Sequence, residues 1–269
     1  MQGASRSALA ESREALAQAL SQETDRARLG EELLQVARLV DANAVLRRSL
    51  ADPSREGADK GQLVHRLFAG RVGDTSAQLA AHIVSRRWAS EADLVVALEQ
   101  CGVEAILAQA EADGRLGQVE DELFRFGRIV DGTSELRSAL TNRLAPVDAK
   151  TALVRQLLGE RSAPETTRLA QLAATHRRTR FDHAVDGYLA IAARRQEQLT
   201  ATVTTAVELR EEQVNRLTTA LGQQYSRDVH VNTVVDPDVV GGIRVEIGDE
   251  VIDGTILSRL DEARRRLTS

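Results

Sequence analysis

Aromatic residues, proline and cysteine are all scarce in this sequence of 269 residues. Aromatic side chains make up 3% of the chain, which contains 4 Pro and 1 Cys. A single cysteine excludes an internal disulfide and is typical of a reducing compartment. The residues that dominate instead, above all Ala, Leu, Arg, Glu and Gln, lose little rotamer freedom in a helix. The composition therefore predicts a mostly α-helical protein.

Long apolar runs and charge of one sign are lacking as well. No window approaches the ~18 continuous apolar residues of a membrane span, and the amino end lacks the apolar segment of a signal peptide. Acidic and basic residues are interleaved at a net charge of −5, whereas a nucleic-acid-binding surface needs a clustered basic face. We expect a protein of the cytosol, or one that sits on a membrane complex without entering the bilayer.

Motifs for catalysis or cofactor binding are also missing. The sequence has no phosphate loop, no GxGxxG, no HExxH and no GxSxG. Its five histidines are not spaced with cysteine as zinc ligands are. We expect Cys101 to be a small packed side chain and Trp88 a core residue, with a partner-contact anchor as the alternative for Trp88. We therefore predict no catalytic residue, no metal and no cofactor, and a protein that binds other proteins.

An internal repeat runs through the helical part at a fixed offset of 90 residues. Residues 32–88 align without gaps with residues 122–178, and 16 of the 57 aligned positions are identical. Unrelated helical segments do not keep one register over three helices and two loops, so the alignment indicates a duplication. Pro53 and Pro146 interrupt the two copies at similar places.

Apolar residues at helical spacing predict the helices of both copies. The opening helix is expected at residues 5–20. Short helices are expected near residues 60–68 and 75–88, with counterparts near 150–158 and 165–180.

The apolar stretch at residues 91–113 lies where the two copies meet. It closes the first copy, and the 90-residue offset also aligns it with the opening helix. One long helix is therefore expected to serve two bundles and to fix their relative orientation. The predicted domains are a first bundle at 1–110, a second bundle at 95–199 and an α/β domain at 200–269.

The tail of the chain is rich in β-branched residues. Thr200–Val207 predicts a strand, and Ile243 and Val245 alternate with charged residues as in a half-buried strand. Gly248 is suited to a tight type II′ hairpin turn. The preceding glycine pair favours a bulge or a close backbone approach over a ligand site. We expect a small mixed sheet with two helices.

This tail resembles the C-terminal signature of the delta subunit of F-type ATP synthases, called the oligomycin-sensitivity-conferring protein in mitochondria. The specific part is a glycine pair before an alternating strand, followed by Val-Ile-Asp-Gly at the start of the last helix. The signature residues are Gly241, Gly242, Ile243, Val245, Gly248, Asp253 and Gly254. The resemblance covers residues 200–269 well and the preceding helices more loosely.

The resemblance implies a non-catalytic connector in the peripheral stalk of an ATP synthase. In that family the helical bundle grips N-terminal helices of the alpha subunits, and the α/β domain holds the ends of the b-type stalk helices. The connector resists rotor torque during proton-driven ATP synthesis. The implied location is peripheral, on the cytoplasmic face of the plasma membrane. No nucleic acid and no bilayer insertion are expected.

A groove for the alpha helices is expected on the first and fifth helices of each bundle, by helix-in-groove recognition. The same apolar stripes are also what a bundle core requires. The candidate groove residues are Leu9, Leu16, Leu79 and Ile83 in the first copy and Ile106, Leu169 and Leu172 in the second.

Two departures from the family pattern stand out. The family usually has one bundle and this chain has two, which leaves open which copy grips alpha. Arg210 replaces the serine cap often found before Glu211, which affects only a helix start. A generic helical adapter or scaffold with this tail architecture is the alternative function. An enzyme is a third possibility only if residues far apart in the sequence assemble an unrecognised site.

Overall fold

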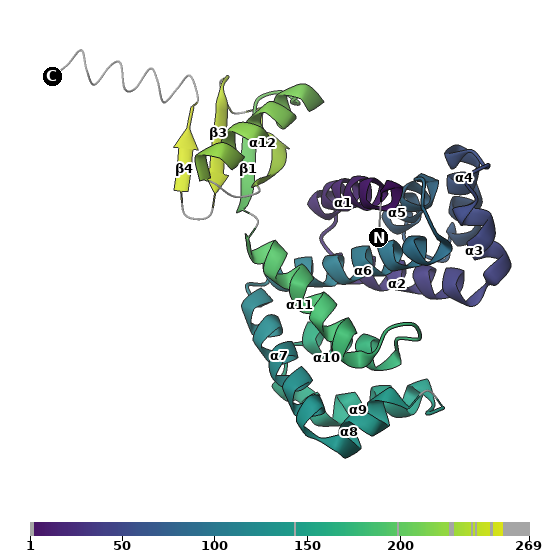
Figure 1. Ribbon diagram of the computed structural model, residues 1–269. Coiled ribbons are helices and arrows are strands. Elements are labelled where there is room, and N and C mark those ends of the chain that lie inside the picture. The colour runs from purple at the N-terminus through teal and green to yellow at the C-terminus, as the bar shows by residue number, and fades with distance from the viewer. Residues whose placement is uncertain are drawn as a thin grey trace, which may run out of the picture. The chain divides into compact units, whose positions relative to one another are not determined.

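The computed structural model describes residues 3–142, 144–197, 199–225, 229–237, 239, 241–247 and 250–254. The chain divides into two compact units, Met1–Ala193 and Arg194–Ser269. The first is helical, and the second contains a small four-stranded sheet (Figure 1). The predicted fold class, mostly α with a small α/β part at the C-terminal end, is confirmed.

The helices of the first unit repeat at the predicted offset. They are α1 (Ala4–Gln22), α2 (Arg26–Ala42), α3 (Ala44–Ala51), α4 (Gly57–Phe68), α5 (Asp74–Ser85), α6 (Glu91–Ala112), α7 (Leu116–Gly132), α8 (Ser134–Thr141), α9 (Val147–Leu158), α10 (Pro164–Thr175) and α11 (Phe181–Glu197), with a 3-10 turn at Gly159–Arg161. Adding 90 to the bounds of α2, α3, α4 and α5 gives the bounds of α7, α8, α9 and α10 at both ends. The helix pattern is thus duplicated together with the sequence.

Short polar side chains start several of these helices. Asp25 accepts a hydrogen bond from the backbone N–H of Arg28 at 3.0 Å, and Asn43 accepts one from Leu46 at 3.0 Å. Ser90 accepts one from Asp93 at 3.1 Å. Each satisfies one of the backbone donors that the first turn of a helix leaves unpaired.

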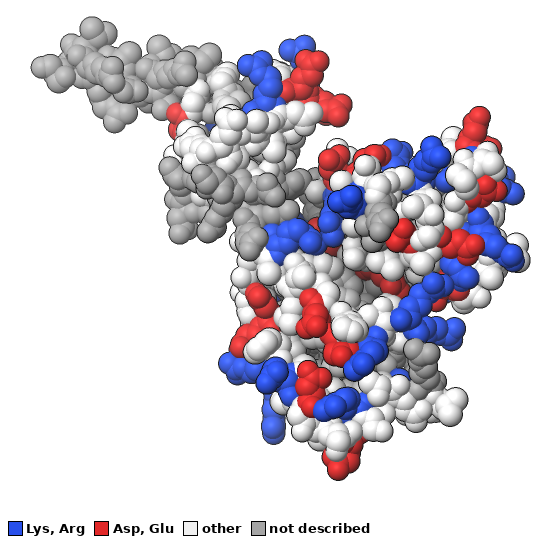
Figure 2. All heavy atoms as spheres, viewed as in Figure 1, with Lys and Arg blue, Asp and Glu red and all other residues white. Residues whose placement is uncertain are grey.

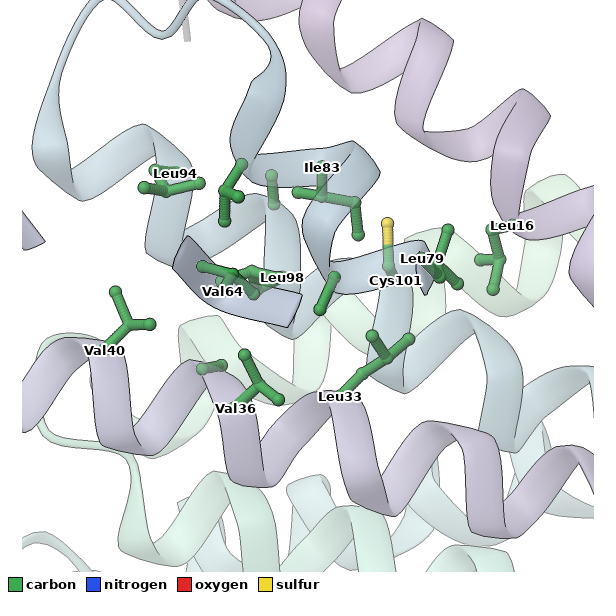
Figure 3. Packing of buried hydrophobic residues seen from close by; sticks show 14 of the residues in the cluster. Leu16, Leu33, Val36, Val40, Val64, Leu79, Ile83, Leu94, Leu98 and Cys101 are labelled. Atoms are coloured by element: carbon green, nitrogen blue, oxygen red, sulfur yellow. The ribbon is translucent and has the colours of Figure 1, made fainter. Parts of the chain in front are cut away.

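The helical unit encloses two hydrophobic cores, and the first is built from α1 through α6. Leu16, Leu33, Ile83 and Leu98 are fully buried there, and Figure 3 shows the side chains of α2, α4, α5 and α6 converging. Trp88 is 3% exposed in this core, and its indole N–H donates to the carbonyl of Ile83 at 2.9 Å. Trp88 is therefore a core residue.

The second core is built mainly from α6, α7, α10 and α11. Leu107 and Leu123 are fully buried, and the rings of Phe126 and Phe181 meet edge to face at 5.9 Å between centroids. Such aromatic pairs add about 0.5–1.5 kcal/mol beyond the area that they bury. This core also contains Leu34 from α2, so the two cores are in contact.

Helix α6 supplies side chains to both cores. Leu98 and Cys101 belong to the first, whereas Ile106 and Leu107 belong to the second. The helix runs without a break from Glu91 to Ala112, which covers nearly all of the stretch expected to be shared.

Helices α2 and α6 cross at a pair of glycines. A Cβ atom on Gly30 would lie 2.6 Å from the carbonyl oxygen of Gly102, and one on Gly102 would lie 2.8 Å from Cγ of Leu34. Real Cβ atoms do not approach a backbone atom as closely as 2.6 Å, so Gly30 is required at this helix separation. A Cβ on Gly102 would also lie 3.0 Å from the carbonyl oxygen of Gly30, which leaves little room there.

The second unit has strand order β2-β1-β3-β4. Its elements are β1 (Leu199–Thr205), α12 (Glu211–Tyr225), β2 (Val229–Val235), β3 (Ile243–Ile247) and β4 (Glu250–Asp253). Strand β1 pairs in parallel with β2 through the α12 crossover and antiparallel with β3. Its core includes Val203, Leu221, Val245 and Ile247. Arg210 precedes α12, and its backbone N–H donates to the side chain of Gln213 at 3.0 Å, which is the bond that a glutamine at this position contributes to a capping box.

The signature residues shape this sheet. Gly241 and Gly242 have φ angles of 66° and 84°, a backbone region that side chains disfavour. Ile243 and Val245 lie in β3, and Gly254 donates its backbone N–H to the carbonyl of Ile243 at 2.9 Å. Gly248 and the predicted last helix, with Ile256, Leu260, Ala263 and Leu267, lie outside the described residues.

Candidate functional site

The predicted groove residues lie mostly inside the two cores. Leu16, Leu79 and Ile83 are at most 4% exposed in the first core, and Ile106, Leu169 and Leu172 are at most 7% exposed in the second. Leu9 is partly buried against the first core. Most of these side chains face the two cores beneath the α1/α5 and α6/α10 helix pairs. A partner helix on either pair would therefore contact other residues.

The surface above the α1/α5 pair is formed by smaller residues. Ala15 and Ala19 on α1 and His82 on α5 are partly buried, and Glu11 on α1 pairs with Arg86 at 2.8 Å. Burial, together with the nearby charge of Arg86, lowers the pKa of His82 below its ordinary value, so the imidazole is neutral at neutral pH. The result is a shallow, largely uncharged surface with an ion pair at one side.

The equivalent surface of the α6/α10 pair is covered. Residues 101–108 of α6 are all buried, whereas among the equivalent residues 11–18 of α1 only Ser12 and Leu16 are buried. The covering elements include α2: its Gly30 lies against Gly102 and Ile106, and the backbone N–H of Arg26 donates to the side chain of Gln109, the counterpart of Ala19, at 3.1 Å. The duplicated helix pair therefore presents an open face in the first bundle and a filled face in the second.

Ion pairs reinforce the contact between α2 and the α10 region. Arg168 of α10 donates to the carboxylate of Glu31 in a two-point contact, at 2.7 Å from Nη2 to Oε2. Arg178 donates to Asp41, at 2.8 Å from Nε to Oδ1. These residues carried no sequence motif, and only the repeat offset could have drawn attention to them.

The α6/α10 pair carries a charged residue at a position where the α1/α5 pair carries an apolar one. Leu9 of α1 has Glu99 as its counterpart on α6, and Glu99 lies 3.1 Å from Nε2 of His176. Nδ1 of His176 accepts hydrogen bonds from the backbone N–H groups of Arg178 and Thr179, which fixes the proton on Nε2. The apolar stripe of the first copy is thus interrupted in the second.

A partly buried carboxylate recurs at the start of α5 and of α10. Glu32 accepts a hydrogen bond from the backbone N–H of Gly73 at 2.9 Å, and Glu122 accepts one from Ala163 at 2.9 Å. Burial raises the pKa of both carboxyls, but hydrogen bonds, foremost from Ser76 to Glu32 and from the Thr166 hydroxyl to Glu122, outweigh it and leave both pKa values below normal. The duplication has thus preserved a helix cap as well as the apolar core.

The remaining reactive or charged groups form no recognisable catalytic arrangement. Among the described residues, no group of His, Cys, Asp and Glu could hold a metal ion, and no helix is long and apolar enough to cross a membrane. Cys101 is fully buried, and burial followed by the charge of Glu104 raises its pKa to about 12. Figure 2 shows acidic and basic side chains interspersed on the visible face of the helical unit.

The fold defines the class of protein: a duplicated helical unit that offers an exposed helix pair, followed by a small α/β unit. A family model described as ATP synthase delta (OSCP) subunit matches residues 101–267. The chain belongs to this family.

Named relatives match almost the whole chain. It is 45% identical to ATP synthase subunit delta of Streptomyces griseus over 99% of both chains. It is 46% identical to that of Streptomyces coelicolor over 100% of this chain and 99% of the relative. It is 43% identical to that of Kineococcus radiotolerans over 98% and 97%.

Among solved structures, a chain of the Toxoplasma gondii mitochondrial ATP synthase hexamer aligns with 62% of this chain and 95% of its own length. The identity is 16% and the TM-score is 0.29.

Family membership determines the general function. The chain is a non-catalytic, structural subunit of the peripheral stalk of an F-type ATP synthase. Its partners are other subunits of that complex. An unrelated adapter that shares only the tail architecture is thereby excluded, because the similarity extends over the helical unit as well.

Proposed function

We propose that the first bundle holds an N-terminal helix of the alpha subunit on the open α1/α5 face. The observation that carries this proposal is the difference between the two equivalent helix pairs: one is open and the other is filled by α2. A helix lying over Ala15, Ala19 and His82 would approach closely because these side chains leave room between α1 and α5. Leu9, Leu16, Leu79 and Ile83 would then support the groove.

In the second bundle, α2 takes the place that a partner helix takes in the first. Ile106 is already in contact with α2, and Leu169 and Leu172 lie in the core beneath. This arrangement supports the proposed organisation into bundles at 1–110 and 95–199 that share a helix at 91–113, and an α/β domain at 200–269. It also favours a single alpha N-terminal helix, held by the α1/α5 face of the first bundle, with none on the α6/α10 face of the second.

The α/β unit is the proposed holder of the b-type stalk helices. In its described part, Val234 and Val251 are 47% and 53% exposed. Both lie on the sheet face opposite Val203 and Val245, as the registers with Thr204 and Glu246 require. The chain would thus connect the catalytic head to the stalk and resist rotor torque, on the cytoplasmic face of the plasma membrane.

Binding of a synthetic peptide with the sequence of the alpha N-terminal helix tests the groove. The full-length chain carrying Ala15→Glu should bind this peptide at least tenfold more weakly, about 1.4 kcal/mol, because the carboxylate enters the helix contact. Isothermal titration calorimetry supplies the dissociation constants. Unchanged affinity in Ala15→Glu would refute the α1/α5 site.

The matched control is Ala10→Glu, the same substitution on the exposed side of α1. It adds equal charge at a position turned away from α5, so affinity should stay within twofold. Loss of binding in both variants would show that charge alone, and not the groove, controls affinity.

A further inference from the structure

The face of α2 that points away from the first core is an interface built by the duplication. Glu31, Leu34 and Asp41 lie on this face, and each contacts the second bundle. Leu34 is 1% exposed within the second core, Glu31 pairs with Arg168, and Asp41 pairs with Arg178. An apolar side chain between two carboxylates is thus matched by α10 and the loop that follows it, which bring Arg168 and Arg178.

The second bundle carries the same face on α7 without that cover. The equivalent residues are Asp121, Phe124 and Asp131. Phe124 is 56% exposed, the side chain of Asp121 is 53% exposed, and Asp131 is exposed. The central apolar residue and both carboxylates therefore recur on α7, where Asp121 pairs with Arg125 at 2.7 Å.

A second copy of this chain does not fit the α7 face. The helix equivalent to α10 in the first bundle is α5, and it carries Gln78 and Trp88 where α10 and its following loop carry Arg168 and Arg178. Gln78 has no charge, and Trp88 is buried in the first core. Head-to-tail stacking would bring no cation to Asp131 and none to Asp121 beyond its own Arg125, which lies 2.7 Å away, so the duplicated unit is not built to polymerise.

We propose that the α7 face formed by Asp121, Phe124 and Asp131 docks a helix of another ATP synthase subunit that, with the segment following it, carries two arginines about ten residues apart. Arg168 and Arg178, ten residues apart, provide the template within this chain. Phe124 would bury against the middle of the partner helix, and the two carboxylates would receive its guanidinium groups. The surface is separate from the α1/α5 groove and does not depend on it.

Photo-crosslinking in the assembled ATP synthase tests the proposal. Phe124 is replaced by benzoylphenylalanine, and the cross-linked peptides are identified by mass spectrometry. The expected product joins α7 to an arginine-bearing helix of another subunit. The control places the same probe at Ile129, also 56% exposed on α7 but turned to another side, and should not mark that helix. A cross-link from Phe124 only to residues 194–269 of the same chain, or none, would overturn the proposal.

Charge reversal supplies a second readout with the full-length chain. Asp121→Lys combined with Asp131→Lys should weaken binding to the cross-linked subunit, prepared as purified protein, by at least tenfold, and Arg→Glu changes in the partner helix should restore it. Ile129→Ser should leave the affinity within twofold. The double lysine variant should still bind the alpha peptide normally, which separates this surface from the groove. Unchanged affinity of the double variant for the cross-linked subunit would contradict the docking surface.

Discussion

The two halves of the helical unit have the same helices and opposite exposed faces. In the first, the α1/α5 pair is open and the outer face of α2 is covered; in the second, the α6/α10 pair is covered and the outer face of α7 is open. The two halves therefore cover each other at one interface, between α2 and the α6/α10 pair. Duplication of a helical bundle has produced one internal interface and left two different faces free, which suits a connector between unlike partners.

Substitutions in the shared helix α6 should have the largest effect, and they test whether the two halves are energetically independent. Leu98→Ala and Leu107→Ala remove fully buried side chains from the first and second core, and each should lower the free energy of unfolding by about 2–5 kcal/mol. Because both side chains lie on α6, we expect both cores to unfold together. The measurement is urea unfolding followed by Trp88 fluorescence, which reports the first core, and by circular dichroism. A Leu107→Ala protein whose Trp88 transition stays at the original urea concentration would show that the bundles are independent.

The glycine crossing should be the next most sensitive place. Gly30→Ala puts a Cβ 2.6 Å from the carbonyl oxygen of Gly102, and such overpacking costs about 1–3 kcal/mol. The control is Gly187→Ala in α11, where a Cβ meets nothing within 4 Å and the helix should gain up to about 1 kcal/mol. Thermal denaturation of both variants measures the contrast, and two equal shifts of the melting temperature would contradict it.

The repeated carboxylate caps should respond alike in both halves. Glu32→Gln and Glu122→Gln should each cost about 1 kcal/mol at pH 7, as lost helix caps do. The pKa of both carboxyls is lowered in the folded state. Their stabilisation is therefore present above the unfolded pKa, about 4.3, and is lost as the pH falls through the folded value. Stability measured from pH 7 to pH 3 should fall less steeply in the double variant than in the unchanged chain. Parallel curves would assign the acid sensitivity to other groups.

The ion pairs between the halves should contribute less. Arg168→Gln and Arg178→Gln remove partly exposed pairs, which typically stabilise by about 0–1 kcal/mol. A double-mutant cycle of Arg178 with Asp41 measures the coupling. A coupling well above that range would mean that the ion pairs, rather than Leu34 and the glycine crossing, hold the halves together.

Cys101 should show no reaction at all in the folded chain. Its thiol is buried on α6, and its pKa of about 12 keeps it protonated at pH 8. Reaction with Ellman's reagent should appear only after unfolding, at the rate of an ordinary thiol. Rapid labelling of the native chain would show that α6 separates from α2 in solution.

Much of the fold was predictable from the sequence, for physical reasons. The 90-residue repeat and the apolar spacing placed α1, α4, α5, α9 and α10 within a few residues, and the alternation of Ile243 and Val245 predicted β3. The short helices α3 and α8 were not predicted. The continuous α6 was expected because residues 91–113 matched two helix positions at once. The glycine pair before β3 identified the family, and the similarity to named delta subunits confirmed it.

The candidate binding face was less predictable. Leu16, Leu79 and Ile83 carry the strong periodic signal, yet a periodic leucine is also what a core requires, and the structure buries all three. Their assignment to a partner groove stays a prediction. Ala15 and Ala19, which line the open face, have no distinctive pattern, because a small side chain contributes little hydrophobic signal while leaving room for another helix.

The sequence alone indicated where most helices and strands lie, that the helical part is duplicated, and which family the chain belongs to. These properties depend on neighbouring residues and on spacing along the chain. Only the tertiary structure decided which copy of each face is open, because that depends on contacts between residues far apart in sequence. Gly30 meets Gly102 and Arg178 meets Asp41; such packing covers one copy of a helix face and leaves its sequence-related counterpart free.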